Sequence, residues 1–137
     1  FATQIASLIS EGVFTKYPGL KAIAIESGVT WVPPLMWRMS KDWRGARIEV
    51  PWVKDAPAEI IRRHVRVTSQ PFDGPDDPAD VAKALDHMLS DDMLLFSSDY
   101  PHWNFEGLDV LPEGFPEAAV SKLLRDNVLA TYPRLGG

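Results

Sequence analysis

Short apolar segments alternate with amphipathic helical patterns along the chain, and this alternation restricts its fold more than any other feature. The predicted helices, which carry apolar residues at helical spacing, cover residues 3–16, 32–43, 55–63, 78–89 and a region from 116 onwards. The predicted strands cover residues 20–26, 65–70 and 93–98. Strands that alternate with helices form right-handed β-α-β units, so the sequence predicts an α/β fold with a parallel sheet.

Aspartates followed closely by proline mark two of the predicted helix starts. Asp77 stands directly before Pro78, which is a capping side chain followed by proline at the first helical position. Asp55 lies two residues before Pro57 and is expected to cap the helix over residues 55–63.

The first predicted strand has two different faces. Ile23 and Ile25 point to one side, and Ala22, Ala24 and Glu26 point to the other. We expect the large branched face to pack under helices, and the small face to line an interior with a carboxylate at its mouth.

The last predicted strand ends in a cluster of polar residues. Four apolar residues, 93–96, lead into two serines, Asp99, a Tyr-Pro turn and His102. Parallel α/β folds place their sites at the carboxyl ends of strands, which makes Asp99 the first candidate for function. On its own it can equally be a turn or capping aspartate, which any α/β fold can contain.

Composition excludes several classes of function. The chain has 14 Lys and Arg against 19 Asp and Glu, a net charge of −5 without a basic cluster, so a nucleic-acid partner is not expected. No stretch approaches the roughly 20 apolar residues of a membrane helix, and no signal-like N-terminus is seen, so we expect no membrane and a cytoplasmic location. The absence of cysteine excludes disulfides and a thiol nucleophile. Nucleotide-binding glycine loops and the G-x-S-x-G elbow are also absent from the sequence.

Two passages, taken in order, match the motifs of a known family. The first passage consists of Tyr17-Pro18-Gly19-Leu20-Lys21, then Glu26-Ser27-Gly28, Trp31, Pro33 and Arg38. The second is Phe96-Ser97-Ser98-Asp99-Tyr100-Pro101-His102, followed by Asn127 in the last helix. Together they resemble the amidohydrolase-related family, which contains metal-dependent hydrolases and decarboxylases similar to aminocarboxymuconate semialdehyde decarboxylase.

This resemblance implies a (β/α)8 TIM barrel, which takes about 250 residues when complete. Residues 1–137 would supply one part of that single domain, its sixth, seventh and eighth strands with their helices. The H-x-H motif of the family's first strand and the histidine of its fifth strand would lie upstream of Phe1. We therefore expect either the missing N-terminal half or a homo-oligomer to cover the open sheet edges.

The resemblance also implies a site. Asp99 matches the family aspartate that binds the metal or takes a proton from the attacking water, and His102 would assist at the rim as substrate contact, acid or further ligand. Glu26 stands where similar decarboxylases carry an acid–base histidine, a departure that leaves the reaction open. The alternative for Glu26 is a structural salt bridge to Arg38 or Arg66.

Substrate contacts are predicted around these groups. Trp31, Tyr100 and Trp103 could line a pocket for an aromatic or unsaturated substrate, and Arg38 could hold a substrate carboxylate. Solvation explains an exposed Arg38 equally well.

Four further aromatic and imidazole side chains have no expected role in the site. Core packing is expected for Trp37 and Trp43, and a structural or solvent-facing role for His64 and His87.

The resemblance thus implies a hydrolase or decarboxylase that depends on a divalent metal ion, with zinc as the expected one. Its substrate would be a small carboxylic acid, amide or ester. Either water attacks an amide or ester-like carbon, or carbon dioxide leaves an unsaturated acid. The alternative is a non-catalytic half-barrel that binds a ligand or partner chain. An H-x-H or D-x-H motif in the reading frame upstream of Phe1 would support the enzyme.

Overall fold

Three parallel strands form the centre of the fold. The computed structural model describes residues 1–88, 91–103, 105, 111 and 113–136. The strands are β1 (Ala22–Ala24), β2 (Val65–Thr68) and β3 (Leu94–Leu95), and they pair in the order β1-β2-β3. Ala24 lies beside Val67, and Val67 beside Leu94, with all pairing parallel. The predicted α/β class and parallel sheet are confirmed.

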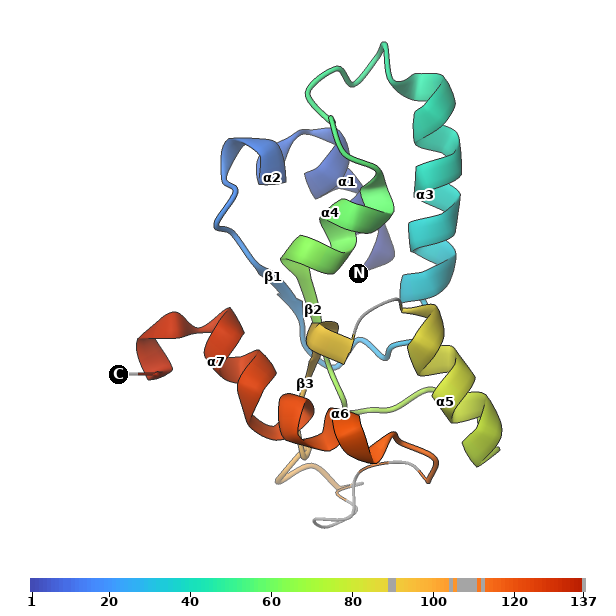
Figure 1. The fold of residues 1–137 in the computed structure, drawn as a ribbon, viewed down its shortest axis with the longest axis vertical. Helices are drawn as coiled ribbons and strands as arrows, with labels where there is room; N and C mark the ends of the chain where they lie inside the picture. Colours follow the sequence, from blue (N-terminus) through green and yellow to red (C-terminus); the bar gives the residue numbers. More distant parts are fainter. Residues whose placement is uncertain (89–90, 104, 106–110, 112, 137) are drawn as a thin grey trace.

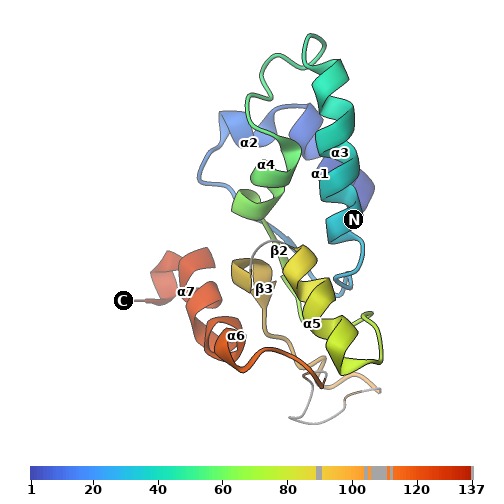
Figure 2. The same ribbon diagram turned by 45° about the vertical axis from the view of Figure 1, so that its right-hand side comes forward.

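Helices connect and flank these strands. The α-helices are α1 (Ala2–Ser10), α2 (Val13–Lys16), α3 (Val32–Ala46), α4 (Pro57–His64), α5 (Pro78–His87), α6 (Glu117–Ser121) and α7 (Asn127–Thr131). Shorter turns are the 3₁₀ segments η1 (Asp91–Met93) and η3 (Pro133–Leu135), and the π-helical segment η2 (Lys122–Asp126). Figures 1 and 2 show α1 to α4 grouped at one end of the molecule, and α5 to α7 around β3 at the other. Among the described helices, none is long and apolar enough to cross a membrane.

The predicted helix over residues 3–16 is divided in the structure. Gly12 adopts a left-handed φ of 70° and divides the predicted helix over residues 3–16 into α1 and α2. A Cβ at Gly12 would lie only 2.4 Å from the indole ring of Trp52, so glycine is required there for space as well as for conformation.

Of the two predicted capping aspartates, one is confirmed and one is wrong. The side chain of Asp77 accepts a hydrogen bond of 2.8 Å from the main-chain N–H of Ala79 and caps α5. Asp55 does not cap α4, because the N-cap position falls on Ala56, one residue later. Its carboxylate instead lies 3.0 Å from Arg63 in the last turn of the same helix.

The two faces of β1 are the reverse of the predicted arrangement. Ala24 is buried in the main apolar cluster with Val67 and Leu94, whereas Ile25 is 59% exposed. Ala22 also packs against this cluster, whereas Ile23 does not belong to it, so the small alanines and not Ile23 face the core. The alternation also ends at Ala24, so the orientation of Glu26 cannot be extrapolated from it.

The core is apolar and links most elements. Its most fully buried members, each at 1% exposure or less, include Met36, Ile61, Val65, Val67, Met93 and Leu123. All four residues of β2 are buried, as expected for the central strand of a covered sheet.

His64 is a structural residue of this core. Its ring stacks on Phe14 with centroids 4.6 Å apart, and Nδ1 lies 2.8 Å from the carbonyl oxygen of Leu20. Burial lowers the pKa of His64, the hydrogen bond to Leu20 opposes that shift, and the nearby charges of Lys21 and Arg63 add to it. The predicted structural role of His64 is thereby supported.

Acidification is therefore expected to destabilise the fold through His64. The unfolded histidine binds a proton near its ordinary pKa of about 6.5, whereas the folded one resists protonation, so stability falls as pH decreases below about 6.5. Urea unfolding of the complete protein between pH 7.5 and 5 measures this loss. His64→Gln should flatten the pH dependence and His87→Gln, on exposed α5, should not. An unchanged slope in His64→Gln would contradict the assignment.

The unpaired edges of the two outer strands lead us to expect that the chain associates with other chains. In the described part of the chain, β1 and β3 each pair on one side only, and Ile25 is left exposed beside them. Unpaired strand edges with apolar neighbours favour pairing with other chains. Residues 1–137 expressed alone are expected to oligomerise or aggregate in size-exclusion chromatography with light scattering. A compact monomer with a cooperative thermal transition would show that the sheet needs no further cover.

Candidate functional site

Side-chain hydroxyls hold the strands together at their carboxyl ends. Beyond the last main-chain pair, Ser69 N–H still donates to Leu95 O at 2.8 Å, and Ser97 N–H then donates to Oγ of Ser69 at 3.0 Å. Gln70 N–H donates in turn to Oγ of Ser97 at 3.0 Å. The ends of β2 and β3 are thus fixed side by side although the regular sheet has ended.

A second hydroxyl joins β1 to β2 at the same edge. Oγ1 of Thr68 accepts a hydrogen bond from the N–H of Glu26 at 3.0 Å and donates one to Gln70 O at 3.1 Å. Thr68 is 7% exposed, so this relay is protected from water. It fixes the backbone at the point where Glu26 leaves the sheet.

Glu26 and Asp99 share an uncommon backbone conformation. Their φ angles are 54° and 61°, and among the described residues no other non-glycine has a positive φ. A left-handed non-glycine residue costs about 1–3 kcal/mol, and such residues concentrate at functional sites. The two carboxylates singled out by the sequence are therefore also the two non-glycine residues with a strained backbone in the described part of the chain.

Asp99 forms a compact unit with His102. The N–H of His102 donates to Asp99 O at 2.7 Å, and Nδ1 of the ring lies 3.3 Å from Oδ2 of Asp99, an ion pair when the imidazole is protonated. The Asp99 side chain is 12% exposed and that of His102 is 52% exposed. The pair thus joins a sheltered carboxylate to a half-exposed imidazole, an arrangement suited to passing a proton between site and solvent.

Glu26 and Asp99 lie at the same end of the sheet but not on neighbouring strands. Glu26 follows β1, Asp99 follows β3, and β2 lies between them. At the usual strand spacing the two strand ends are about 10 Å apart. A small substrate spanning the end of β2 could reach both.

The predicted salt bridge of Glu26 is not formed within the described residues. Arg38 pairs with Asp42 on the surface of α3 at 2.6 Å. Arg66 turns its guanidinium to main-chain carbonyls, donating to Val65 O at 2.8 Å and to Arg62 O at 3.1 Å. Neither arginine is thus engaged with Glu26. The role of Arg38 in binding a substrate carboxylate stays a prediction.

Two aromatic residues lie close to Asp99 in the chain. Tyr100 and Trp103 are 73% and 89% exposed, and the ring of Tyr100 meets Phe105 edge-on with centroids 5.3 Å apart. Trp31 is half-buried, and its indole N–H donates to Gly28 O at 3.1 Å, two residues after Glu26. Trp31 is thus tied to the loop that follows Glu26, and Tyr100 and Trp103 belong to the segment that follows Asp99.

The two remaining tryptophans differ. Trp43 packs against the core and donates to Val53 O at 3.0 Å, as expected. Trp37 is 51% exposed and meets His87 edge-on, so its predicted place in the core is wrong.

Metal donors are few in the described ranges, where no group of three or more His, Asp or Glu side chains could hold an ion. Asp99 and His102 supply two donors, fewer than the ligand sets of protein metal sites. A metal bound at Asp99 would need further ligands from elsewhere in the protein.

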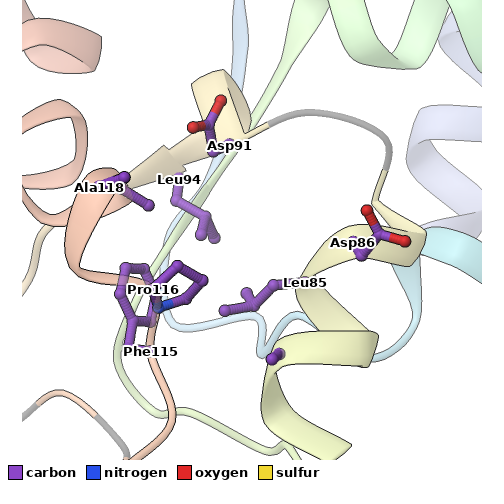
Figure 3. Close-up of a pocket in the computed structure, with 9 residues that line it drawn as sticks. Leu85, Asp86, Asp91, Leu94, Phe115, Pro116 and Ala118 are labelled. Carbon is purple, nitrogen blue, oxygen red and sulfur yellow. The ribbon is translucent and has the colours of Figure 1, made fainter.

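A cavity of about 560 Å³ lies elsewhere, on the helix side of β3. Figure 3 shows Leu85 and Asp86 of α5 on one side of it, with Phe115 and Pro116 on the other and Leu94 of β3 behind. None of the predicted site residues lines it.

Two residues that organise the site carried little signal in the sequence. Asp73, in the loop after β2, accepts hydrogen bonds from the loop after β1. Asn127, noted only for its position, is 4% exposed and donates through its amide to Asp91 O at 2.7 Å and Leu94 O at 2.8 Å. Asn127 thereby ties the last helix to the start of β3, whose other end leads to Asp99.

A sequence model of amidohydrolases matches residues 1–134, almost the entire chain. The chain belongs to the amidohydrolase family. A search of the curated proteins found no match for this amidohydrolase.

Solved structures agree in fold. An amidohydrolase from Mycobacterium avium subsp. paratuberculosis K-10 is 32% identical with a TM-score of 0.70, covering 93% of this chain and 32% of its own. A dihydroxybenzoic acid decarboxylase from Polaromonas sp. JS666, with bound manganese and 2-nitroresorcinol, is 26% identical with a TM-score of 0.68, covering 99% and 40%. A 2,6-dihydroxybenzoate decarboxylase from Rhizobium is 22% identical with a TM-score of 0.67, covering 99% and 41%. The chain therefore spans less than half the length of each of these proteins.

Substitutions at Glu26 directly test its left-handed backbone conformation. At an ordinary helical or extended position, glycine is less stable than alanine by about 0.5–1 kcal/mol. At φ 54° the order should reverse, because alanine keeps the left-handed strain and glycine relieves it. Urea unfolding of Glu26→Gly and Glu26→Ala measures the difference. The same pair at Ile25 serves as control, and a Glu26→Gly variant clearly weaker than Glu26→Ala would contradict the conformation.

Proposed function

We propose that this amidohydrolase chain forms the sixth, seventh and eighth strands of a (β/α)8 barrel and part of its active site. The reaction proposed is metal-dependent decarboxylation of a small aromatic carboxylic acid. The observation that carries the proposal is the pair of left-handed carboxylates, Glu26 and Asp99, at the carboxyl ends of parallel strands. That end is where barrel enzymes place their catalytic residues.

Decarboxylation is favoured over hydrolysis by two observations. The similar protein from Polaromonas is a dihydroxybenzoic acid decarboxylase. The mouth beside Asp99 also presents Tyr100 and Trp103, whose rings suit an aromatic substrate. Hydrolysis of an amide or ester is the second candidate, because a carboxylate such as Asp99 can also take a proton from water.

Asp99 and His102 would transfer the proton that replaces the carboxyl group on the substrate ring. Loss of carbon dioxide breaks the bond between ring and carboxyl carbon, and a proton must take the place of the carboxyl group on the ring. Asp99, sheltered and in contact with the imidazole, would deliver that proton, and half-exposed His102 would restore it from solvent. Glu26, opposite across β2, would orient the polar substituents of the substrate.

A divalent metal ion is part of the proposal. When bound, it would polarise substrate oxygens as a Lewis acid. Asp99 is the ligand that this chain would contribute, and the other ligands would come from parts of the protein outside the described residues. The similar decarboxylase from Polaromonas holds manganese, whereas zinc was expected from the sequence. Zinc and a cytoplasmic location remain predictions.

The central prediction concerns Asp99→Asn in the complete protein. The amide keeps the shape of the side chain but cannot exchange the proton, so turnover should fall by about 10²–10⁴-fold, as for loss of a positioned acid–base group. His102→Asn should cost less, because water can replace a half-exposed imidazole. The assay follows carbon dioxide release from a panel of hydroxybenzoic acids, with metal content measured on each variant.

Asp76→Asn, an exposed aspartate in the loop after β2, is the matched control and should retain full turnover. An Asp99→Asn protein with normal metal content and near-normal turnover would remove Asp99 from the mechanism.

A further inference from the structure

We propose that Asp73 is a positioning residue that holds the Glu26 loop in its active conformation. This inference rests on the proposed function, because it assigns Asp73 a role through Glu26. Asp73 lies in the loop between β2 and α5, whereas Glu26 lies in the loop between β1 and α3. Asp73 would therefore act on Glu26 from the neighbouring strand-to-helix loop.

The carboxylate of Asp73 joins the two loops by three hydrogen bonds. Oδ1 accepts from the N–H of Val29 at 2.6 Å and from the N–H of Thr30 at 3.2 Å. Oδ2 accepts from the hydroxyl of Thr30 at 2.6 Å. Burial opposes ionisation of Asp73, but the bonds from Thr30 and Val29 outweigh it and lower its pKa. The charged carboxylate is thus the form that the loop after β1 binds.

Gly28 makes this approach possible. Its φ is 66°, and a Cβ at this position would lie 2.3 Å from Oδ2 of Asp73. A side chain at residue 28 would therefore displace the Asp73 carboxylate from its present position. The carbonyl of Gly28 also accepts the indole N–H of Trp31, so the same short segment sets the position of a proposed substrate contact.

The backbone around Glu26 is therefore held at two places, by the end of β2 and by the loop after β2. On one side its own N–H is bound by Thr68. On the other, the residues just after it are bound by Asp73. A left-handed glutamate is disfavoured unless its surroundings fix it. With the Thr68 tie alone, residues 27–30 can relax and carry the Glu26 carboxylate away from the mouth.

A purely structural role makes a different prediction. If Asp73 only ties down the start of α3, its loss lowers stability and leaves kcat and its pH profile unchanged. If it positions Glu26, its loss lowers kcat, because a misplacement of about 1 Å can cost 10²-fold. The two roles are therefore separable by kinetics on folded protein.

The experiment compares Asp73→Ala, Asp73→Asn and the control Asp76→Ala in the complete protein. Asp73→Ala should lower kcat by about 10–10²-fold with a smaller change in KM. Asp73→Asn keeps one oxygen for the two N–H groups and should recover most of the loss. Asp76→Ala, in the same loop, should be unaffected. Amide exchange should rise at Val29 and Thr30 in Asp73→Ala while the strands stay protected.

A double-mutant cycle with Glu26→Gln tests whether Asp73 affects kcat through Glu26. If Asp73 acts through Glu26, Asp73→Ala has little further effect on kcat once Glu26 is changed. Equal fold-losses from Asp73→Ala in both backgrounds, or normal kcat in Asp73→Ala with fast exchange at Val29, would overturn the positioning role. Normal turnover in both Glu26→Gln and Asp99→Asn would instead overturn the proposed function, and the positioning role with it.

Discussion

The arrangement of the core and of the candidate site depends on β2 lying between β1 and β3. Among the three described strands it alone has neighbours on both sides, and all four of its residues are buried. Because the pairing is parallel, all three strands direct their carboxyl ends to the same edge, and the polar residues that follow them meet there. Val65 and Val67 pack toward the helices, so β2 joins the apolar core to the polar mouth.

The mouth is built by side chains rather than by the regular sheet. The strands are only two to four residues long, and Thr68, Ser69 and Ser97 continue the hydrogen bonding after the ladder ends. Hydroxyls can both donate and accept, so they can bridge backbones that diverge. This lets the chain turn sharply at Glu26 and Asp99 while the strand ends stay in place.

This amidohydrolase chain corresponds to only part of the similar proteins. The chain matches 32% to 41% of the lengths of the similar proteins compared, and in its described part β1 and β3 each keep one unpaired edge. Asp73 and Asn127 show that much of the site is organised from outside it. One ties two loops together at the mouth, and the other fixes β3 at its start.

By itself the sequence determined the alternation of helices and strands, the parallel sheet, the cap at Asp77 and the two candidate carboxylates. These follow from local rules: apolar periodicity, proline and glycine placement, and polar residues at strand ends. It misjudged the faces of β1 and the burial of Trp37, since residue size does not tell which side the helices approach. Only the tertiary structure decided that Glu26 and Asp99 are left-handed, that Asp99 contacts His102, and that Asp73 binds Val29 and Thr30. Asp73 and Thr30 are 43 residues apart in the chain, and contacts between such distant positions form only when the core brings two strand ends together.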